Sequence, residues 1–158
     1  MEPRDKQPSR HRAAPALRDL EPVLDRITSR LAARHSRSFS RETVESYVEE
    51  CSWQLSARAR LGRHLPVLIE RFADQRLGAL ARGLGLSPKP VPEVLFVCTE
   101  NAGRSQLAAA IMRHRAGAGA RVLTAGSEPG EEIAPVVLRL LDEQGLGVGE
   151  EFPKPLTA

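Results

Sequence analysis

Cysteine and histidine are scarce in this sequence, which limits the kinds of site that it can build. Its two cysteines, Cys51 and Cys98, are too few for a disulfide scaffold and form no C-x-x-C pair. The four histidines are scattered without the spacing of metal ligands, so we expect no metal site.

Long apolar segments are missing as well. No apolar run approaches the roughly 20 residues that cross a bilayer. Residues 1–18 are polar and basic, and they lack the apolar stretch of a secretory signal. With 41% hydrophobic and 27% charged residues, the composition is typical of a soluble globular protein. We expect a cytoplasmic location and no membrane partner.

Charge is unevenly distributed along the chain. Residues 1–90 carry 17 basic and 11 acidic side chains, whereas residues 91–158 carry 6 basic and 9 acidic ones. This asymmetry predicts two units with different roles. A basic helical unit raises the hypothesis of a regulatory or nucleic-acid-binding module. Acidic residues at 42, 45, 49 and 50 interrupt any basic stripe, so a docking or dimerisation role is favoured and nucleic acid is not expected as a partner.

The first half of the chain has the periodicity of three amphipathic helices. Residues 1–16 have no periodicity and predict a disordered tail, whereas residues 17–86 predict a three-helix bundle. Ser40 is placed to cap the second helix, and Pro66 suits the first turn of the third. The residues expected to face inward are Leu20, Val23, Leu24, Ile27 and Leu31, then Val44, Tyr47, Val48, Cys51 and Leu55, then Leu65, Leu68, Ile69, Phe72, Leu77, Leu80 and Leu84.

A proline-rich linker at residues 87–92 separates this bundle from an α/β unit at residues 93–158. The order is a strand at 94–97, a helix at 104–115, a strand at 121–125 and a helix at 131–144, which favours parallel α/β packing. The apolar run 94–97 predicts a strand buried on both faces. The inward helical residues are expected to be Leu107, Ala108, Ile111 and Met112, then Ile133, Val136, Val137, Leu140 and Leu141, with Gly145 ending the last helix.

The segment between the first predicted strand and helix has the pattern of an anion-binding site. A loop in that position turns several backbone N–H groups inward, and the helix N-terminus adds a partial positive charge. Such a nest binds tetrahedral oxyanions. The same field lowers the pKa of Cys98 below the free value of about 8.5. Arg104, with five residues between it and Cys98, can hold two oxygens through its planar fork.

These positions define the predicted site. Cys98 is the nucleophile, Arg104 is the anion clamp, and Ser105 donates a hydrogen bond to the sulfur. Glu100 brings a negative charge into the loop unless its side chain points outward. The strand before the loop and the helix after it argue against a structural cysteine that precedes an arginine by chance. The predicted anion-binding residues are Thr99, Glu100, Asn101, Ala102, Gly103 and Arg104.

Residues 94–106 closely resemble the active-site segment of the low-molecular-weight protein tyrosine phosphatase and arsenate reductase superfamily. The run Asn-Ala-Gly-Arg-Ser-Gln at 101–106 is most similar to the arsenate reductase branch, and residues 124–129 and 152–157 continue the resemblance. Residues 17–86 resemble a small helical-bundle domain that precedes such domains in actinobacteria. The resemblance implies that Cys98 attacks bound arsenate, or phosphate if the chain is a phosphatase.

The same resemblance sets further expectations. We expect no bound cofactor. A reductase would need a second thiol, and no cysteine other than Cys98 lies in residues 93–158. We therefore expect an external thiol such as mycothiol, or a redoxin partner. Cys51 lies on an apolar stripe, where cysteine is usually core. The family's general-acid aspartate would follow Ala158, so residues 93–158 are expected to be a partial domain with an open strand edge, weak turnover and self-association. An inactive fragment that acts as a binding module is the remaining alternative.

Overall fold

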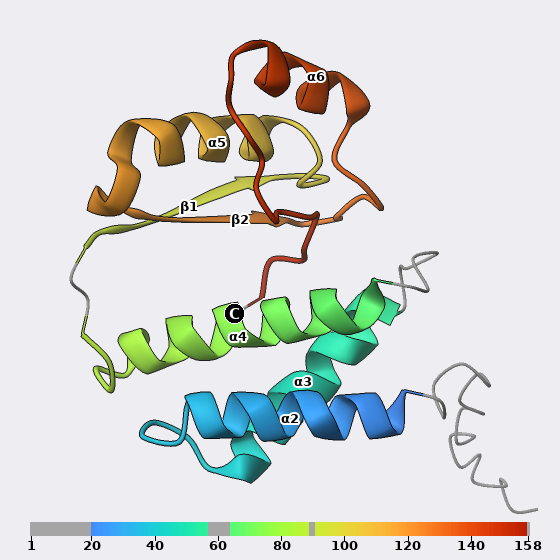
Figure 1. Cartoon of the computed structure of the whole chain (residues 1–158), viewed down its shortest axis with the longest axis vertical. Coiled ribbons are helices and arrows are strands. Elements are labelled where there is room, and N and C mark those ends of the chain that lie inside the picture. Colours follow the sequence, from blue (N-terminus) through green and yellow to red (C-terminus); the bar gives the residue numbers. More distant parts are fainter. Residues whose placement is uncertain (1–19, 57–63, 89–90, 158) are drawn as a thin grey trace, which may run out of the picture.

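The computed structural model describes residues 20–56, 64–88 and 91–157, and these form two units stacked along the long axis of the molecule (Figure 1). The predicted tail at 1–16 and residues 89–90 of the predicted linker lie outside the described residues. The prediction of a helical bundle followed by a parallel α/β unit is confirmed. The elements are α2 (Glu21–Arg34), α3 (Arg41–Ser56), α4 (Leu65–Gly83), β1 (Glu93–Cys98), α5 (Arg104–Ala116), a short 3-10 helix (Gly117–Gly119), β2 (Arg121–Gly126) and α6 (Pro135–Glu143).

Helices α2, α3 and α4 form what we call the helical unit, and its interior is a continuous hydrophobic core. The side chains that it buries completely include Ile27, Leu31, Val44, Val48, Cys51, Ile69 and Leu77. The Thr43 backbone N–H donates to Ser40 Oγ at 3.3 Å, which confirms the predicted cap of α3. Pro66 lies in the first turn of α4, also as predicted.

The prediction that Leu84 belongs to the core is wrong, because α4 ends before it. Gly85 has a φ of 71°, and the Leu86 N–H donates to the Ala81 carbonyl at 2.8 Å. This left-handed termination turns the chain away from the helix axis. Leu84 therefore projects to solvent from the terminating turn.

Strands β1 and β2 pair in parallel, with Glu93 opposite Arg121 and Cys98 opposite Gly126. We call these strands, with α5, α6 and the chain to residue 157, the sheet unit. Helix α5 covers one face of the two strands (Figure 1). The prediction of a strand buried on both faces is wrong, because Leu95 and Val97 are 48% and 49% exposed. Successive side chains of a strand alternate between faces, so these two residues share the face opposite α5.

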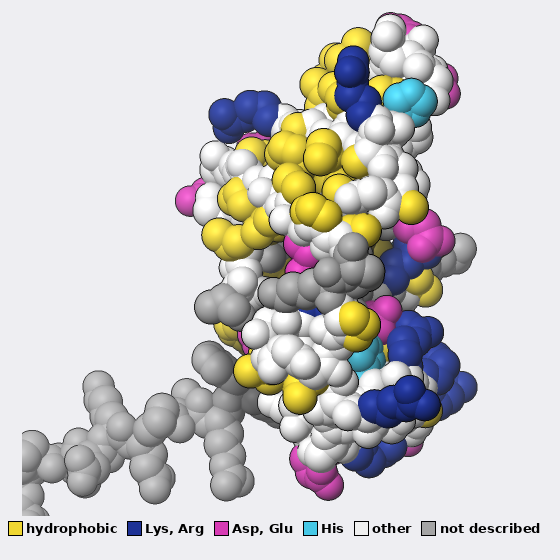
Figure 2. Space-filling model, turned by 90° about the vertical axis from the view of Figure 1, so that its left-hand side faces the viewer, with side chains coloured by type: hydrophobic (Ala, Val, Ile, Leu, Met, Phe, Trp, Pro, Cys, Tyr) yellow, Lys and Arg dark blue, Asp and Glu magenta, His cyan; other side chains and the backbone are white. Residues whose placement is uncertain are grey.

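The inward faces of α5 and α6 also differ from the predicted ones. In α5 the buried residues are Ser105, Gln106, Ala109 and Ala110, whereas Ile111 is exposed. The two alanines allow the helix backbone to approach the strands closely. In α6, Val136 and Leu140 are exposed and Leu141 is buried. Figure 2 shows the resulting surface, with hydrophobic side chains gathered on the sheet unit in its upper half.

Helix α6 begins at Pro135 rather than at residue 131. Residues 131–134 are held in the preceding loop, where the Ala134 N–H donates to the Ala102 carbonyl at 2.9 Å. Gly145 ends the helix as predicted, with a φ of 65° and a hydrogen bond from the Leu146 N–H to the Leu141 carbonyl.

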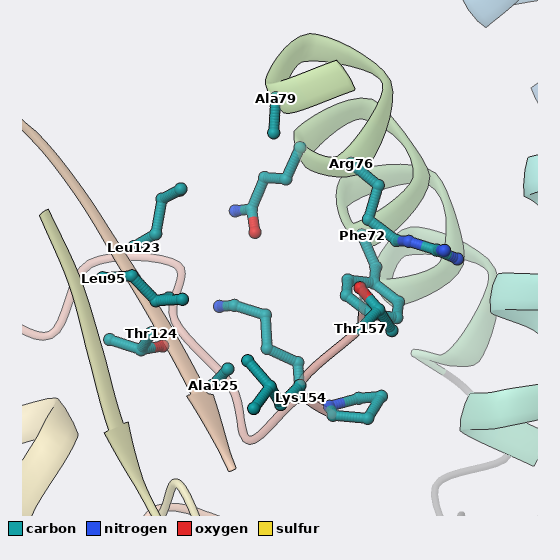
Figure 3. A pocket seen from close by; sticks show the side chains of 12 residues that line it. Phe72, Arg76, Ala79, Leu95, Leu123, Thr124, Ala125, Lys154 and Thr157 are labelled. Atoms are coloured by element: carbon teal, nitrogen blue, oxygen red, sulfur yellow. The ribbon is translucent and has the colours of Figure 1, made fainter. Parts of the chain in front are cut away.

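The two units meet where residues 150–157 descend from the sheet onto α4 (Figure 1). A cavity of about 140 Å³ lies between them; Leu95 and Leu123 line it from the strands, and Phe72 and Arg76 line it from α4 (Figure 3). The Arg82 Nε donates to Glu93 Oε1 at 2.6 Å at the other end of α4. None of the described helices is long and apolar enough to cross a membrane.

Candidate functional site

The candidate site is the loop that joins β1 to α5. Cys98 is the last residue of β1 and Arg104 is the first residue of α5, so the strand and the helix fix both ends of the loop. This strand–loop–helix arrangement was predicted from the sequence. It places Cys98 at the carboxyl end of a parallel strand, where α/β proteins bind their ligands.

The carbonyl groups of the loop are all occupied by donors from outside it. The backbone N–H groups of Ser127, Glu128, Gly130 and Ala134 donate to the carbonyls of Cys98, Thr99, Glu100 and Ala102, respectively, and Gln106 Nε2 donates to the carbonyl of Asn101. These distances are 2.8–3.2 Å. In a trans peptide the C=O and the following N–H point in opposite directions. The N–H groups of residues 99–103 therefore point away from these donors, which is the arrangement of an anion nest.

Asn101 has an unusual backbone conformation, and its hydrogen bonds link the loop to Cys98 and Ser105. It has a φ of 51°, the left-handed region that Asn tolerates better than most residues. Its backbone N–H donates to Cys98 Sγ at 3.2 Å, and its side-chain Nδ2 donates to Ser105 Oγ at 2.8 Å. The side chain turns into the protein interior, where the Lys154 N–H donates to its Oδ1 at 3.0 Å. Only the backbone of Asn101 is directed to the thiol.

The environment of Cys98 favours its ionised form. Burial opposes ionisation, but hydrogen bonds from the Ser105 hydroxyl and from the backbone N–H groups of Ser105, Asn101 and Gly103 outweigh it and lower the pKa of the thiol. The Ser105 Oγ lies 3.0 Å from the Cys98 Sγ. The structure thus brings Cys98 and Ser105 together as the sequence predicts.

Arg104, Thr99 and Glu100 are exposed around the loop. Exposure of Glu100 leaves its carboxylate in contact with water, so its charge is screened from the interior of the loop. Arg104 lies on the first turn of α5, and the contact of its guanidinium with a bound anion remains a prediction.

Sequence reasoning missed the structural role of Gly126, which lies beside the loop at the end of β2. A Cβ atom at this position would lie 2.6 Å from the Thr99 carbonyl oxygen and 2.9 Å from the Asn101 backbone nitrogen. Only glycine lets β2 approach the loop so closely. A glycine at the end of an apolar strand was the available signal.

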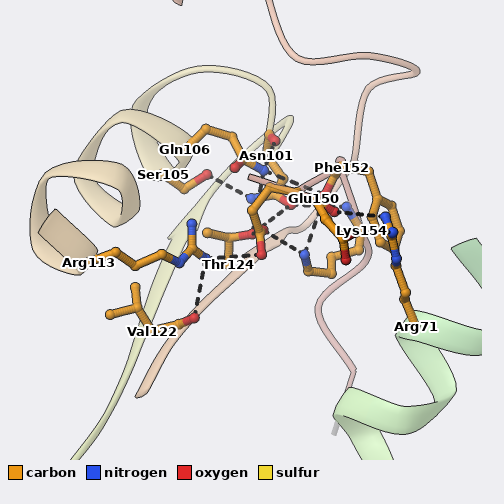
Figure 4. A network of polar contacts seen from close by, with 11 residues as sticks. Arg71, Asn101, Ser105, Gln106, Arg113, Val122, Thr124, Glu150, Phe152 and Lys154 are labelled. Atoms are coloured by element: carbon orange, nitrogen blue, oxygen red, sulfur yellow. Dashed lines mark hydrogen bonds and ion pairs between the residues drawn. The ribbon is translucent and has the colours of Figure 1, made fainter. Parts of the chain in front are cut away.

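A buried polar network behind the loop was also missed (Figure 4). Lys154 is 2% exposed, and its Nζ donates to Glu151 Oε2 at 2.7 Å. Glu151 also pairs with Arg113 at 3.0 Å and accepts a hydrogen bond from Thr124 Oγ1 at 2.7 Å. Burial lowers the pKa of Lys154, and the charge of Glu151 opposes that shift. The polar Thr124 within an apolar strand was the visible sign of this network.

The network reaches the loop through two side chains. Gln106 Nε2 lies 3.4 Å from Thr124 Oγ1 and 3.0 Å from the Asn101 carbonyl oxygen. The Lys154 backbone N–H donates to Asn101 Oδ1 at 3.0 Å. Across the described ranges, no group of three histidine, cysteine or acidic side chains lies close enough together to hold a metal ion.

Comparison with known proteins places both halves of the chain. Residues 24–81 match the family model described as protein-tyrosine-phosphatase-like, N-terminal domain. Residues 93–158 match the model of the low molecular weight phosphotyrosine protein phosphatase.

Among solved structures, the thioredoxin-dependent arsenate reductase of Corynebacterium glutamicum is 46% identical, with a TM-score of 0.84 over 87% of this chain and 69% of that one. An arsenate reductase in the phosphate-binding state is 24% identical over 42% of this chain and 50% of that one, with a TM-score of 0.39. A low molecular weight protein tyrosine phosphatase from T. tengcongensis is 26% identical over 42% and 49%, with a TM-score of 0.39.

Proposed function

Because the chain belongs to the low-molecular-weight protein tyrosine phosphatase and arsenate reductase superfamily, we propose that its loop at residues 98–104 binds arsenate and that Cys98 attacks the arsenic. One observation carries the proposal. The Cys98 sulfur accepts hydrogen bonds from the Asn101 N–H and the Ser105 hydroxyl, beside a loop whose carbonyls are all turned away. That arrangement supplies a thiolate and an anion nest at one point.

In the first step the Cys98 thiolate donates an electron pair to arsenic and forms an S–As bond. One arsenate hydroxyl takes up a proton from solvent, its As–O bond breaks, and it leaves as water. The inward N–H groups of the loop and the fork of Arg104 stabilise the negative charge on the remaining oxygens. Arsenic remains pentavalent in this adduct.

In the second step an external thiolate attacks the Cys98 sulfur. A sulfur–sulfur bond forms, the S–As electron pair stays on arsenic, and trivalent arsenite leaves. A further thiol then reduces the mixed disulfide and restores Cys98. The two external thiols supply the two electrons between them and leave as a disulfide, so the chain itself needs no bound redox cofactor.

The properties of Cys51 support an external thiol. Its side chain is fully buried in the core of the helical unit, and burial raises the pKa of the thiol to about 11. A thiol in that state is a poor nucleophile at neutral pH. We propose mycothiol as the reductant; thioredoxin is the alternative, since the similar C. glutamicum protein is described as thioredoxin-dependent.

The binding step is tested by protection of Cys98. Iodoacetamide labels the full chain with or without arsenate, and peptide mass spectrometry reads Cys98 and Cys51 separately. We expect arsenate and phosphate to slow the labelling of Cys98, and Arg104→Lys to weaken this protection because a point charge lacks the bidentate fork. Labelling of Cys98 that saturating arsenate leaves unchanged would contradict the proposed site.

The reaction is tested by supplying mycothiol, glutathione and thioredoxin systems separately and measuring arsenite. Cys98→Ser should abolish arsenite formation, and Cys51→Ala should retain it. Activity with thioredoxin alone that Cys51→Ala removes would contradict the external-thiol mechanism and make Cys51 the second thiol. Aryl phosphate hydrolysis in the same preparations measures the alternative phosphatase activity.

A further inference from the structure

Phe152 belongs to the sheet unit by sequence, but its side chain joins the hydrophobic cluster of the helical unit. It is 8% exposed and clusters with residues of all three helices. Glu150, two residues before Phe152, is paired with α4, where Arg71 Nη2 lies 2.6 Å from Glu150 Oε1. We call residues 150–155 the bridging segment, because the helical unit holds one side of it.

The other side of the bridging segment holds the Cys98 loop. The Lys154 N–H donates to Asn101 Oδ1 at 3.0 Å, and Gln106 Nε2 lies 3.5 Å from the Phe152 carbonyl oxygen. The Lys154 carbonyl accepts a hydrogen bond from the Gly126 N–H at 2.9 Å. The segment therefore contacts the loop, the first turn of α5 and the end of β2, all within a few residues of Phe152.

Lys154 is fixed between the two units. Its Nζ lies 4.6 Å from the centre of the Phe152 ring and 2.7 Å from Glu151 Oε2. The same residue lines the cavity between the strands and α4, where Figure 3 shows its side chain between Leu95 and Phe72. A displacement of Phe152 from the helical core would therefore move the Lys154 backbone.

We infer that the helical unit positions the Cys98 thiol, with Phe152 as the anchor and Lys154 as the positioning residue that orients Asn101. The path is short: Phe152 fixes the bridging segment, the Lys154 N–H fixes the Asn101 side chain, and Asn101 fixes Ser105 and the N–H that faces the sulfur. The helical unit therefore contributes to the geometry of the Cys98 site.

The physical reason lies in the conformation of Asn101. A non-glycine residue with a φ of 51° is strained and persists only where its surroundings hold it. The Lys154 N–H is one of the groups that hold it, since it binds the Asn101 side chain in its inward position. Without that bond the residue can relax, and two of the hydrogen bonds to the sulfur, those from the Asn101 N–H and from the Ser105 hydroxyl, depend on it. The catalytic consequence rests on the proposed role of Cys98 as nucleophile.

The test is the pH profile of Cys98 alkylation in the full chain, read at the peptide level. Phe152→Ala should raise the pKa of Cys98 by up to about one pH unit and slow its labelling at pH 6.5 by about three- to tenfold. Phe152→Leu keeps an apolar anchor and should retain most of the wild-type profile. The matched control is Val48→Ala, which removes volume from the same core on α3. It should lower the melting temperature and leave the profile unchanged.

A Phe152→Ala protein that melts at a lower temperature but keeps the wild-type profile overturns the inference. If Phe152→Ala does not fold, Phe152→Val replaces it as a smaller truncation of the same anchor; it should shift the profile in the same direction by a smaller amount, and an unchanged profile in that variant overturns the inference equally. The proposed function fails separately. A chain whose low Cys98 pKa responds to Phe152→Ala, but which neither binds nor reduces arsenate, contradicts the proposed function and supports the inference.

Discussion

The helical unit and the sheet unit have different kinds of interior. In the helical unit the fully buried side chains are mostly aliphatic, such as Ile27, Leu31, Ile69 and Leu77. In the sheet unit the fully buried side chains include the polar residues Asn101 and Gln106. Apolar residues of the same unit such as Leu95 and Val97 remain half exposed. The first unit is stabilised by packing, whereas the second uses its interior for the hydrogen bonds that shape a loop.

The two cysteines show the same difference at the level of one atom. Cys51 is surrounded by the helical core, and burial raises the pKa of its thiol to about 11. Cys98 receives hydrogen bonds that overcome burial and lower the pKa of its thiol. A thiol in this chain is therefore inert or reactive according to the unit that contains it.

The largest expected effect is the loss of core volume in the helical unit. Ile69→Ala should lower the free energy of unfolding by about 2–5 kcal/mol, because Ile69 is fully buried and its removal leaves a cavity. Leu95→Ala removes a similar volume from the sheet face and should cost about 1 kcal/mol or less. Urea denaturation of both variants measures the difference. Equal losses would show that the two interiors are packed alike.

Gly126→Ala should distort the loop from the sheet side. The new Cβ would lie 2.6 Å from the Thr99 carbonyl oxygen, so backbone must move. Overpacking of this kind costs about 1–3 kcal/mol, and we expect slower labelling of Cys98. Gly83→Ala is the control, since the space around Gly83 is open and alanine favours a helix. Unchanged thiol reactivity in Gly126→Ala would show that the loop tolerates the shift.

The cysteines predict opposite responses of stability to pH. Because the folded pKa of Cys51 is raised, its contribution to stability is complete below the unfolded value of about 8.5 and is lost as the pH rises toward about 11. Because the folded pKa of Cys98 is lowered, its contribution is present above the unfolded value and is lost as the pH falls through the folded pKa.

Unfolding of Cys51→Ala and Cys98→Ser between pH 6 and 10.5 separates these contributions. Cys51→Ala should lose the wild-type decline in stability at high pH.

Ser105→Ala removes a hydrogen bond to the Cys98 sulfur, so the pKa of the Cys98 thiol should rise. A wild-type chain in which both cysteines label at the same rate at pH 7 would refute the contrast.

The smallest expected change in the free energy of unfolding is that of Val97→Lys, a variant that should also change the self-association of the chain. Val97→Lys places a charge on the half-exposed strand β1 and should alter the free energy of unfolding by about 0.5 kcal/mol or less. It should reduce self-association, because charged strands resist pairing with other chains. Val67→Lys is the matched control, since Val67 on α4 is 47% exposed and Val97 is 49% exposed. Sedimentation velocity compares the three proteins; equal association in all of them argues against a role for β1.

The sequence was sufficient for the elements and for the thiol loop, and insufficient for what surrounds them. Helical periodicity is a local signal, so the stripes of α2, α3 and most of α4 were predicted correctly. The exposure of Val136 and Leu140 was not, because a stripe shows that a face is apolar without showing that a neighbour covers it. Likewise the segment 98–105 was visible as a motif, whereas Lys154 lies about 50 positions away and joins the loop only through its backbone N–H.

The outward carbonyls of the loop bear on how the site is assembled during folding. Four of their five partners lie at residues 127–134, which follow the loop along the chain, and Lys154 comes later still. The loop cannot take its final shape until these distant contacts form, and long-range contacts of this kind form slowly. A short peptide spanning β1 to α5 would carry the motif and still behave as an ordinary thiol. Transplanting the site into another scaffold would require three separate stretches of chain.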